Sequence, residues 1–317
     1  MNRAPRANTT YDPEWDHDAR GRGPWQRRFK VAQLMARMHY HASVDSDAPA
    51  VSRSGPVVSL TSYGSRIKTV HLTIESIARG LERPSRLILW LDDRAALANL
   101  PRPLRRLQRR GLEVLPTENF GPHKKYFPYV RSEDIGVPLV TADDDVLYPN
   151  WWLAGLVAAH RENPAAVHCY RAHVAKVERS GARFAPYADW SPCTSVTPSH
   201  LNFSTGCSGV LFPPAVLAAL KSSGSEFIGR CDFADDIWLK LHALRSGCPV
   251  AQITDVPIRF LGLLRTQRIG LFQANLFGGG NDRALAATFE SPDLRRLAQI
   301  ASAPRESRGE IRANAQP

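Results

Sequence analysis

A nearly continuous apolar run, RLILWL at residues 86–91, constrains the fold of this chain most. A strand with one face in solvent alternates apolar and polar residues, whereas a strand buried on both faces does not. Similar short runs occur at residues 57–61, 112–115 and 138–142, and helix-like patterns separate them. This alternation predicts an α/β fold with a mostly parallel central sheet and helices on both faces.

Further elements are expected along the chain. Helices are predicted at residues 67–79, 149–162 and 237–245, and strands at residues 166–170, 250–253 and 258–261. Residues 171–205 are less regular and suggest a hairpin between 172–177 and 183–185, within a smaller mixed portion of the fold. The polar segment from about residue 291 is expected to be a poorly ordered tail.

Composition narrows the class of protein. With 317 residues and 43% hydrophobic content, the chain can bury a sizeable core. It has no run of about 18 apolar residues and no apolar signal-peptide segment, so we expect a protein that neither spans a membrane nor is exported. Its five cysteines include no C-x-x-C pair, which favours reduced thiols in the cytoplasm.

The net charge of +11 favours anionic partners, such as phosphates or an acidic membrane face. No helix-turn-helix, zinc-finger or RNA-binding aromatic pattern is visible, so nucleic acid is not an expected partner. Charge alone therefore selects no partner.

Residues 24–41 read as a basic amphipathic helix. Trp25, Phe29, Ala32 and Ala36 fall at helical spacing, and arginines and a lysine lie around them. Two interpretations remain open. The helix packs on the protein body with its arginines exposed, or it makes a peripheral contact with an anionic membrane at the inner face.

Three consecutive carboxylates, Asp143, Asp144 and Asp145, follow the strand-like run at 138–142. They are expected on a loop at the carboxyl end of a strand, where open α/β sheets bind ligands. Asp143 and Asp145 can reach one divalent cation from a single turn, and Mn²⁺ or Mg²⁺ prefers oxygen ligands. The competing interpretation is a solvated acidic turn.

A second acidic cluster, CDFADD, precedes the helix predicted at 237–245. Capping of the helix explains one aspartate well, but explains Asp232, Asp235 and Asp236 together less well. If this helix end faces the first cluster, a carboxylate here can act as a general base toward an acceptor hydroxyl.

The order of these motifs resembles a GT-A-fold glycosyltransferase, of the family-2-like kind found in bacterial polysaccharide and glycolipid synthesis. The resemblance spans about residues 56–283. It is carried by these segments in order: VSLTSYGSRIKTVHLTIESI, LILWLDD, GPHKKY, TADDDVLYP, TGCSGVLFPP, CDFADDIWLK and GGGND. It implies a Rossmann-like catalytic domain at residues 56–290, after a basic extension and linker at 1–55 and before the tail at 291–317.

The resemblance also implies an activity. A sugar would move from a nucleotide-diphosphate donor, with a UDP-sugar preferred, to a hydroxyl of a glycan or glycolipid, with inversion at the anomeric carbon. Asp145 would bind the metal, and Asp143 would bind the metal or the ribose. Asp236, beside Asp235, matches the second residue of the family's "ED" pair and is the predicted base.

The remaining implied contacts surround the nucleotide. The loop after the first strand would line the nucleoside, an acidic residue after the second strand would read the base, and a lysine would contact the phosphates. Asp144 is predicted to belong to the same donor-binding group. These residues are Thr61, Tyr63, Arg66, Asp92, Asp93, Lys124, Lys125, Asp143 and Asp144.

The chain departs from the family pattern at several points. The usual "ED" is "DD", which shortens the base by one methylene, and SYGSR replaces the usual asparagine-containing first loop. No late histidine stands out as a third metal ligand. Asn281 and Asp282, or Arg265 and Arg268, are the candidates to contact the diphosphate instead.

Two aromatic residues and two other functions are also compatible with the sequence. Trp190 and Trp238 could stack on a sugar, although a structural role is favoured. A nucleotidyltransferase also holds phosphates with paired carboxylates, but TSYGSR is a poor phosphate loop. A non-catalytic basic protein that binds anionic lipid or nucleic acid would show steep salt dependence and no effect of losing Asp236.

Overall fold

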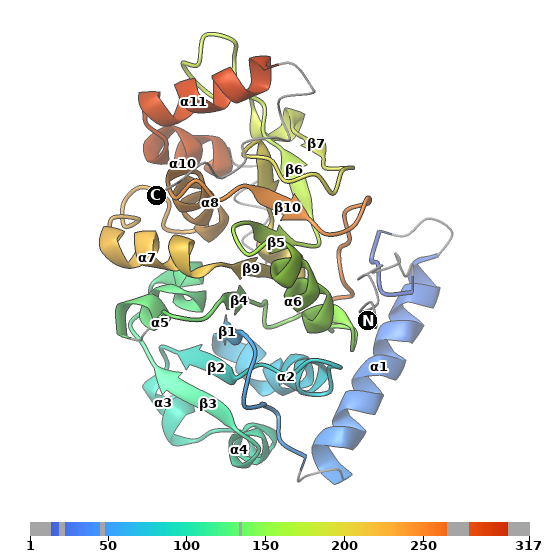
Figure 1. The fold of residues 1–317 in the computed structure, drawn as a ribbon. Helices are drawn as coiled ribbons and strands as arrows, with labels where there is room; N and C mark the ends of the chain where they lie inside the picture. The colour runs from blue at the N-terminus through green and yellow to red at the C-terminus, as the bar shows by residue number, and fades with distance from the viewer. Residues whose placement is uncertain (1–13, 19–22, 45–47, 133–134, 265–278, 304–317) are drawn as a thin grey trace, which may run out of the picture.

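The computed structural model describes residues 14–18, 23–44, 48–132, 135–264 and 279–303 (Figure 1). A seven-stranded sheet lies at the centre, with strand order β10-β5-β9-β4-β1-β2-β3. Strand β9 runs antiparallel to its neighbours β4 and β5, and all the other pairings are parallel. The predicted α/β architecture with a mostly parallel sheet is therefore confirmed.

The strands of this sheet are short and buried. They are β1 (Val57–Thr61), β2 (Arg86–Leu91), β3 (Leu112–Pro116), β4 (Leu139–Thr141), β5 (Val167–Cys169), β9 (Val210–Phe212) and β10 (Val250–Gln252). A second, three-stranded antiparallel sheet has the order β7-β6-β8. It consists of β6 (Ala172–Val174), β7 (Ser191–Pro192) and β8 (Asn202–Ser204), and is the smaller mixed portion expected from the sequence.

Helices cover both faces of the large sheet (Figure 1). One core contains Leu87 and Leu89 of β2, and the other contains Ile88 and Trp90, because successive side chains of a strand point to opposite faces. The first core is completed by α2 (Val70–Ala78), α4 (Arg102–Arg109) and α6 (Trp152–Glu162), and the second by α5 (Phe127–Ser132), α7 (Pro214–Ser223) and α8 (Asp235–Arg245).

Other helical segments add to these layers or surround them. They are α1 (Pro24–Val44), η1 (Gly64–Lys68), α3 (Arg94–Ala98), η2 (Gly121–Lys125), η3 (Tyr187–Asp189), η4 (Gly206–Ser208), α10 (Gly280–Thr288) and α11 (Ser291–Ser302). Among the described residues, no helix combines the length and the apolar character that crossing a bilayer requires.

Helix α1 packs along α2 at the edge of the molecule (Figure 1). Its buried side chains Val31, Leu34 and Met38 join Leu72 of α2 and Leu261 in a third apolar cluster. A fully buried aliphatic side chain of this size contributes about 1.5–3 kcal/mol to stability. Residues 24–41 therefore pack on the protein body, as one interpretation expected, but through a different face from the apolar positions that the sequence indicated.

Two sequence expectations differ from the structure. Residues 258–261 were predicted as a strand, but Phe260 forms only an isolated bridge with Asp16, next to a bridge between Val146 and Gly262. The start of the predicted tail, residues 291–302, is helix α11.

Helix α11 is held to the body in two ways. Leu294 and Leu297 are buried in the same core as α8, and Arg245 of α8 forms an ion pair with Asp293 at 2.8 Å. The Arg- and Ala-rich composition of this segment conceals two leucines three positions apart, which suffice for a packed helical face.

Candidate functional site

The acidic triplet lies immediately beyond β4, beside the loop that follows β1. Strand β1 is the point at which the strand order reverses, since the chain continues to β2 on one side and β4 pairs on the other. In open α/β sheets a crevice forms there, at the carboxyl ends of the strands. The expectation that the triplet lies on a loop at the carboxyl end of a strand is confirmed.

Three hydrogen bonds to the backbone of the triplet hold it in place. The Thr73 hydroxyl of α2 donates to the carbonyl of Asp144 at 3.0 Å, and the Leu263 N–H donates to the carbonyl of Asp145 at 2.7 Å. The Tyr148 hydroxyl accepts from the N–H of Asp143 at 2.9 Å. Residues 262 and 263, directly after the segment predicted as a strand, thus support the acidic loop from one side.

The first loop and the triplet are joined through Asp144. Its buried carboxylate accepts from the Ser62 hydroxyl at 2.5 Å and from the Arg66 guanidinium at 2.9 Å. The same guanidinium lies 3.3 Å from a carboxylate oxygen of Asp145. Burial raises the pKa of Asp144, and Arg66 opposes that rise. These contacts make Asp144 a link between the two loops.

Lys125 connects the two acidic clusters. Its ammonium forms an ion pair with Asp143 and lies 3.8 Å from a carboxylate oxygen of Asp235. Burial lowers the pKa of Lys125, but Asp143 and Asp235 outweigh burial and raise it well above the usual value. Residues far apart in the sequence therefore meet around a single positive charge.

A buried histidine fixes the turn that carries this lysine. One ring nitrogen of His123 lies 2.8 Å from the Tyr126 hydroxyl, and the other lies 2.9 Å from the carbonyl of Cys231. The ring also stacks on Phe227 at a centroid distance of 4.0 Å. Because Cys231 shortly precedes α8, His123 ties the position of η2 to the start of that helix.

Asp236 is a half-buried residue in the first turn of α8. Its two carboxylate oxygens accept from the Gly206 N–H at 3.1 and 3.0 Å. Burial and the adjacent charge of Asp235 raise the pKa of Asp236 to about 7, while Lys125 acts in the opposite direction. Ala234 precedes the helix, so neither aspartate is its N-cap. A carboxyl group with this pKa can accept a proton near neutral pH.

Gly206 makes this contact possible. A Cβ atom at position 206 would lie 2.9 Å from a carboxylate oxygen of Asp236, closer than a carbon and an oxygen normally approach. Nearby, Gly209 has a φ of 83° and faces the ring of Trp152, so the turn η4 is closely packed. The sequence showed TGCSG as a small-residue turn but did not indicate that it binds Asp236.

The residues present fit a divalent cation bound through few protein ligands. Three adjacent carboxylates lie beside two cations, Arg66 and Lys125, and burial, then the charge of Asp143, raises the pKa of Asp145 to about 6. Among the described residues, no group of three His, Cys, Asp or Glu side chains is arranged around a common point. Mg²⁺ is usually held by one or two carboxylates, waters and substrate phosphates, which matches the pair Asp143 and Asp145.

The structure places the predicted nucleoside contacts along the same edge. Tyr63 is exposed, and the Arg66 guanidinium lies 5.3 Å from the centre of its ring. Thr61 is buried and donates to the carbonyl of Trp90 at 2.9 Å. The predicted role of Tyr63 requires an accessible ring, whereas the Thr61 hydroxyl already has a partner within the sheet.

The acidic residues after β2 have separate partners. Asp92 forms an ion pair with Lys124 at 2.7 Å, and Asp93 accepts from the N–H of Ala96, which caps α3. Lys124 and Lys125 are thus neighbours that contact different carboxylates. Because Lys124 belongs to η2, its ion pair connects Asp92 to that turn.

The remaining candidates from the sequence are two tryptophans, the pair Asn281 and Asp282, and two arginines. Trp190 and Trp238 are buried, which confirms the structural role favoured for them. Asp282, at the start of α10 beside Asn281, accepts from the N–H of Tyr187 at 2.8 Å. Arg265 and Arg268 lie outside the described residues.

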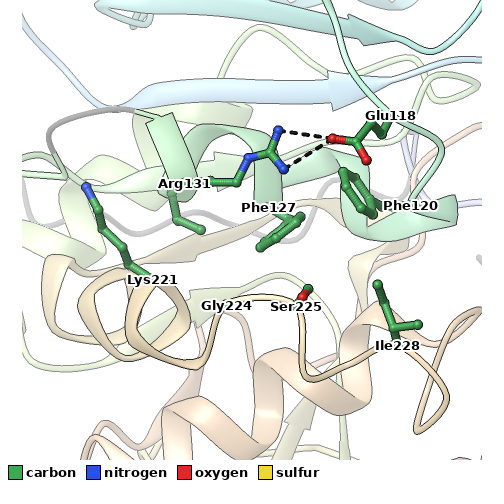
Figure 2. A pocket seen from close by; sticks show the side chains of 9 residues that line it. Glu118, Phe120, Phe127, Arg131, Lys221, Gly224, Ser225 and Ile228 are labelled. Atoms are coloured by element: carbon green, nitrogen blue, oxygen red, sulfur yellow. Dashed lines mark hydrogen bonds and ion pairs between the residues drawn. The ribbon is translucent and has the colours of Figure 1, made fainter.

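A cavity of about 510 Å³ lies next to η2 but contains none of the predicted site residues (Figure 2). Phe120 and Phe127 line it, together with Arg131, whose guanidinium pairs with Glu118 at 3.3 Å. Because Phe120 directly precedes η2, the cavity and the acidic site are on neighbouring parts of the chain.

Comparison with known proteins yields matches only among solved structures, since no family model and no curated protein matches this chain. One is the mannosyltransferase PcManGT from Pyrobaculum calidifontis in complex with GDP-Man and Mn²⁺, with 12% identity, 90% of this chain and 85% of that chain covered, and a TM-score of 0.46. Another is S. aureus TarS 1–349, with 16% identity, 63% of this chain and 58% of that chain covered, and a TM-score of 0.42. The mannosyltransferase belongs to the enzyme class that the sequence motifs resemble. Both TM-scores are below 0.5, so the assignment of an activity depends on the site itself.

Proposed function

We propose that this protein is an inverting glycosyltransferase that uses a nucleotide-diphosphate sugar and a divalent cation. One observation carries the proposal. Asp143 and Asp235, from the two acidic clusters, both lie within 4 Å of the Lys125 ammonium. The ordered motifs of the sequence predicted that these clusters meet at one site, and a solvated acidic turn would not lead to this convergence.

The residues would divide the work as follows. Asp236 takes the proton of the acceptor hydroxyl, whose oxygen forms a bond to the anomeric carbon while the bond from that carbon to the phosphate oxygen breaks. A base on the face opposite the leaving group gives inversion. Lys125 lies between this base and the acidic triplet, where it stabilises the negative charge of the leaving diphosphate.

Asp143 and Asp145 are the residues that would hold Mn²⁺ or Mg²⁺. When bound, the cation neutralises the growing charge of the departing diphosphate. Arg66 orients the triplet through Asp144, and Tyr63 offers an exposed ring to the nucleoside. The proposed donor is a UDP-sugar. The GDP-Man bound to PcManGT makes GDP-sugars the second group to test.

The acceptor is proposed to be a hydroxyl of a glycan or glycolipid. The base at Asp236 is half-buried beside the turn η4, and this arrangement suits a hydroxyl that approaches from solvent. We also propose that the protein is located in the cytoplasm, at the inner face of the membrane.

A thermal-shift screen of UDP- and GDP-sugars, each with and without Mn²⁺, tests the proposal. We expect a rise in Tm that requires nucleotide and metal together, because a bound ligand stabilises the folded state by mass action. Transfer is then measured as release of the nucleoside diphosphate. Asp255→Asn, which removes an exposed carboxylate, is the matched control for changes at Asp236. The absence of any nucleotide-dependent shift would contradict the proposal.

A further inference from the structure

The N-terminal helix α1 has two apolar faces, and only one of them is packed. The inner face consists of Val31, Leu34 and Met38, which are buried against α2 and its surroundings. The outer stripe is defined here as Trp25, Phe29, Ala32, Ala36 and Tyr40, all of which are exposed. These positions recur every three or four residues, so they form one continuous stripe along the helix.

Large aromatic side chains dominate the outer stripe. The exposed fractions are 82% for Trp25, 74% for Phe29 and 61% for Tyr40. Burial of such rings is strongly favourable, and Trp and Tyr favour the boundary between an apolar phase and water. Scattered exposed apolar residues need no explanation, but three aromatic rings aligned on one helix indicate a binding surface.

Positive charge accompanies the stripe. Exposed Arg28 and Arg37 lie on α1, and the Arg28 guanidinium is 5.9 Å from the centre of the Trp25 ring. The other two cations turn back to the protein, since Arg27 donates to the carbonyl of His17 at 2.7 Å and Lys30 pairs with Glu14 at 3.0 Å. Residues 24–44 contain no Asp or Glu. The surface is therefore aromatic and cationic.

We propose that the outer stripe of α1 binds the interface of an anionic lipid bilayer, with the aromatic rings among the headgroups and Arg28 and Arg37 on lipid phosphates. A basic helix with aromatic residues on one face is suited to lie in such an interface. A second copy of this chain is a poorer occupant, because two stripes face to face would bring arginines together. The proposal does not depend on the transferase activity.

Co-sedimentation with vesicles of phosphatidylcholine alone, or with 30% phosphatidylglycerol, tests the proposal. We expect the full chain to bind only the anionic vesicles, and to be released as salt increases. The variant Trp25→Ser/Phe29→Ser should bind about tenfold more weakly for each ring lost. Arg28→Gln/Arg37→Gln should lose about fivefold for each arginine.

Matched controls separate this surface from general stickiness and from net charge. Leu81→Ser/Val196→Ser removes two other exposed apolar side chains, and Arg161→Gln/Arg295→Gln removes two exposed arginines elsewhere. Both controls should bind like the wild type, and all variants should keep the wild-type Tm, because the changed residues lie outside the packed inner face.

Several results would overturn the proposal. Wild-type protein that stays in the supernatant with anionic vesicles would do so, as would Trp25→Ser/Phe29→Ser protein that sediments like wild type. Equal binding to both kinds of vesicle would remove the role of the arginines. Dimerisation in the absence of lipid, lost in the aromatic variant and accompanied by no vesicle binding, would assign the stripe to self-association instead.

Discussion

The two acidic clusters of the site differ in what neutralises their charge. In the first, Asp144 receives the Ser62 hydroxyl and the Arg66 guanidinium, and Asp143 pairs with Lys125. In the second, Asp236 accepts hydrogen bonds from a single backbone N–H, that of Gly206. A cationic partner opposes the rise in pKa that burial causes, whereas a carboxylate beside a like charge and a lone amide binds a proton more readily.

This difference assigns separate chemistry to the two clusters. The first has three adjacent carboxylates beside Arg66 and Lys125, an arrangement that suits the binding of a cation and, through it, a diphosphate. The second has a carboxyl with a pKa of about 7, which suits proton transfer near neutral pH. If the comparison holds, changes in the first cluster should impair donor binding, and changes in the second should impair transfer.

The largest effect is expected for Asp236→Asn. An amide cannot accept the acceptor proton, so the transfer rate should fall by roughly 100- to 10,000-fold, the usual contribution of a general base. Donor binding with Mn²⁺ should stay near the wild-type value. The rate is measured as nucleoside diphosphate release, with Asp255→Asn as control. Equal rates in Asp236→Asn and wild type would remove Asp236 as the base.

Asp145→Ala should instead impair donor binding. Loss of this carboxylate should weaken metal-dependent donor binding by at least the roughly 10- to 100-fold that loss of a group supporting a metal ligand costs. Isothermal titration with nucleotide and Mn²⁺ measures the change. A variant that binds the nucleotide as tightly as wild type, with the same response to Mn²⁺, would show that the triplet has another role.

Gly206→Ala should impair transfer without removing any functional group. The added Cβ would lie 2.9 Å from a carboxylate oxygen of Asp236 and displace that carboxylate. A small misplacement of a reacting group costs up to about 100-fold, and we expect roughly tenfold here. Gly23→Ala, where a Cβ would have nothing within 4 Å, is the matched control. An unchanged rate would show that the contact with Gly206 does not position the base.

The smallest effect is a shift of the pH profile. A base must be deprotonated, so the rate should rise as pH increases through about 7, where Asp236 loses its proton. Asp235→Asn removes the neighbouring negative charge that raises this pKa, so the rising limb should move to lower pH. At a pH below 7, the variant should keep a larger fraction of its maximal transfer rate than the wild type does. A limb that stays in place would mean that another group titrates.

Much of the fold followed from local patterns. The run at 86–91 is strand β2 with the same bounds, and both of its faces are buried, as its continuous apolar character predicted. Helices such as α11 were missed because their few buried leucines lie among arginines and alanines. Residues 258–261 were misassigned because an apolar run also suits a segment that contacts the body by single bridges.

By itself, the sequence determined where the strands and the two acidic clusters lie along the chain, because burial and repulsion between neighbouring charges act over a few residues. Only the tertiary structure decided which charges meet. Lys125 lies between Asp143 and Asp235, and Gly206 reaches Asp236, because the loops at one end of the sheet converge there. Likewise, helical spacing indicated one apolar stripe of α1, but packing against α2 decided that another face is buried and that this stripe faces solvent.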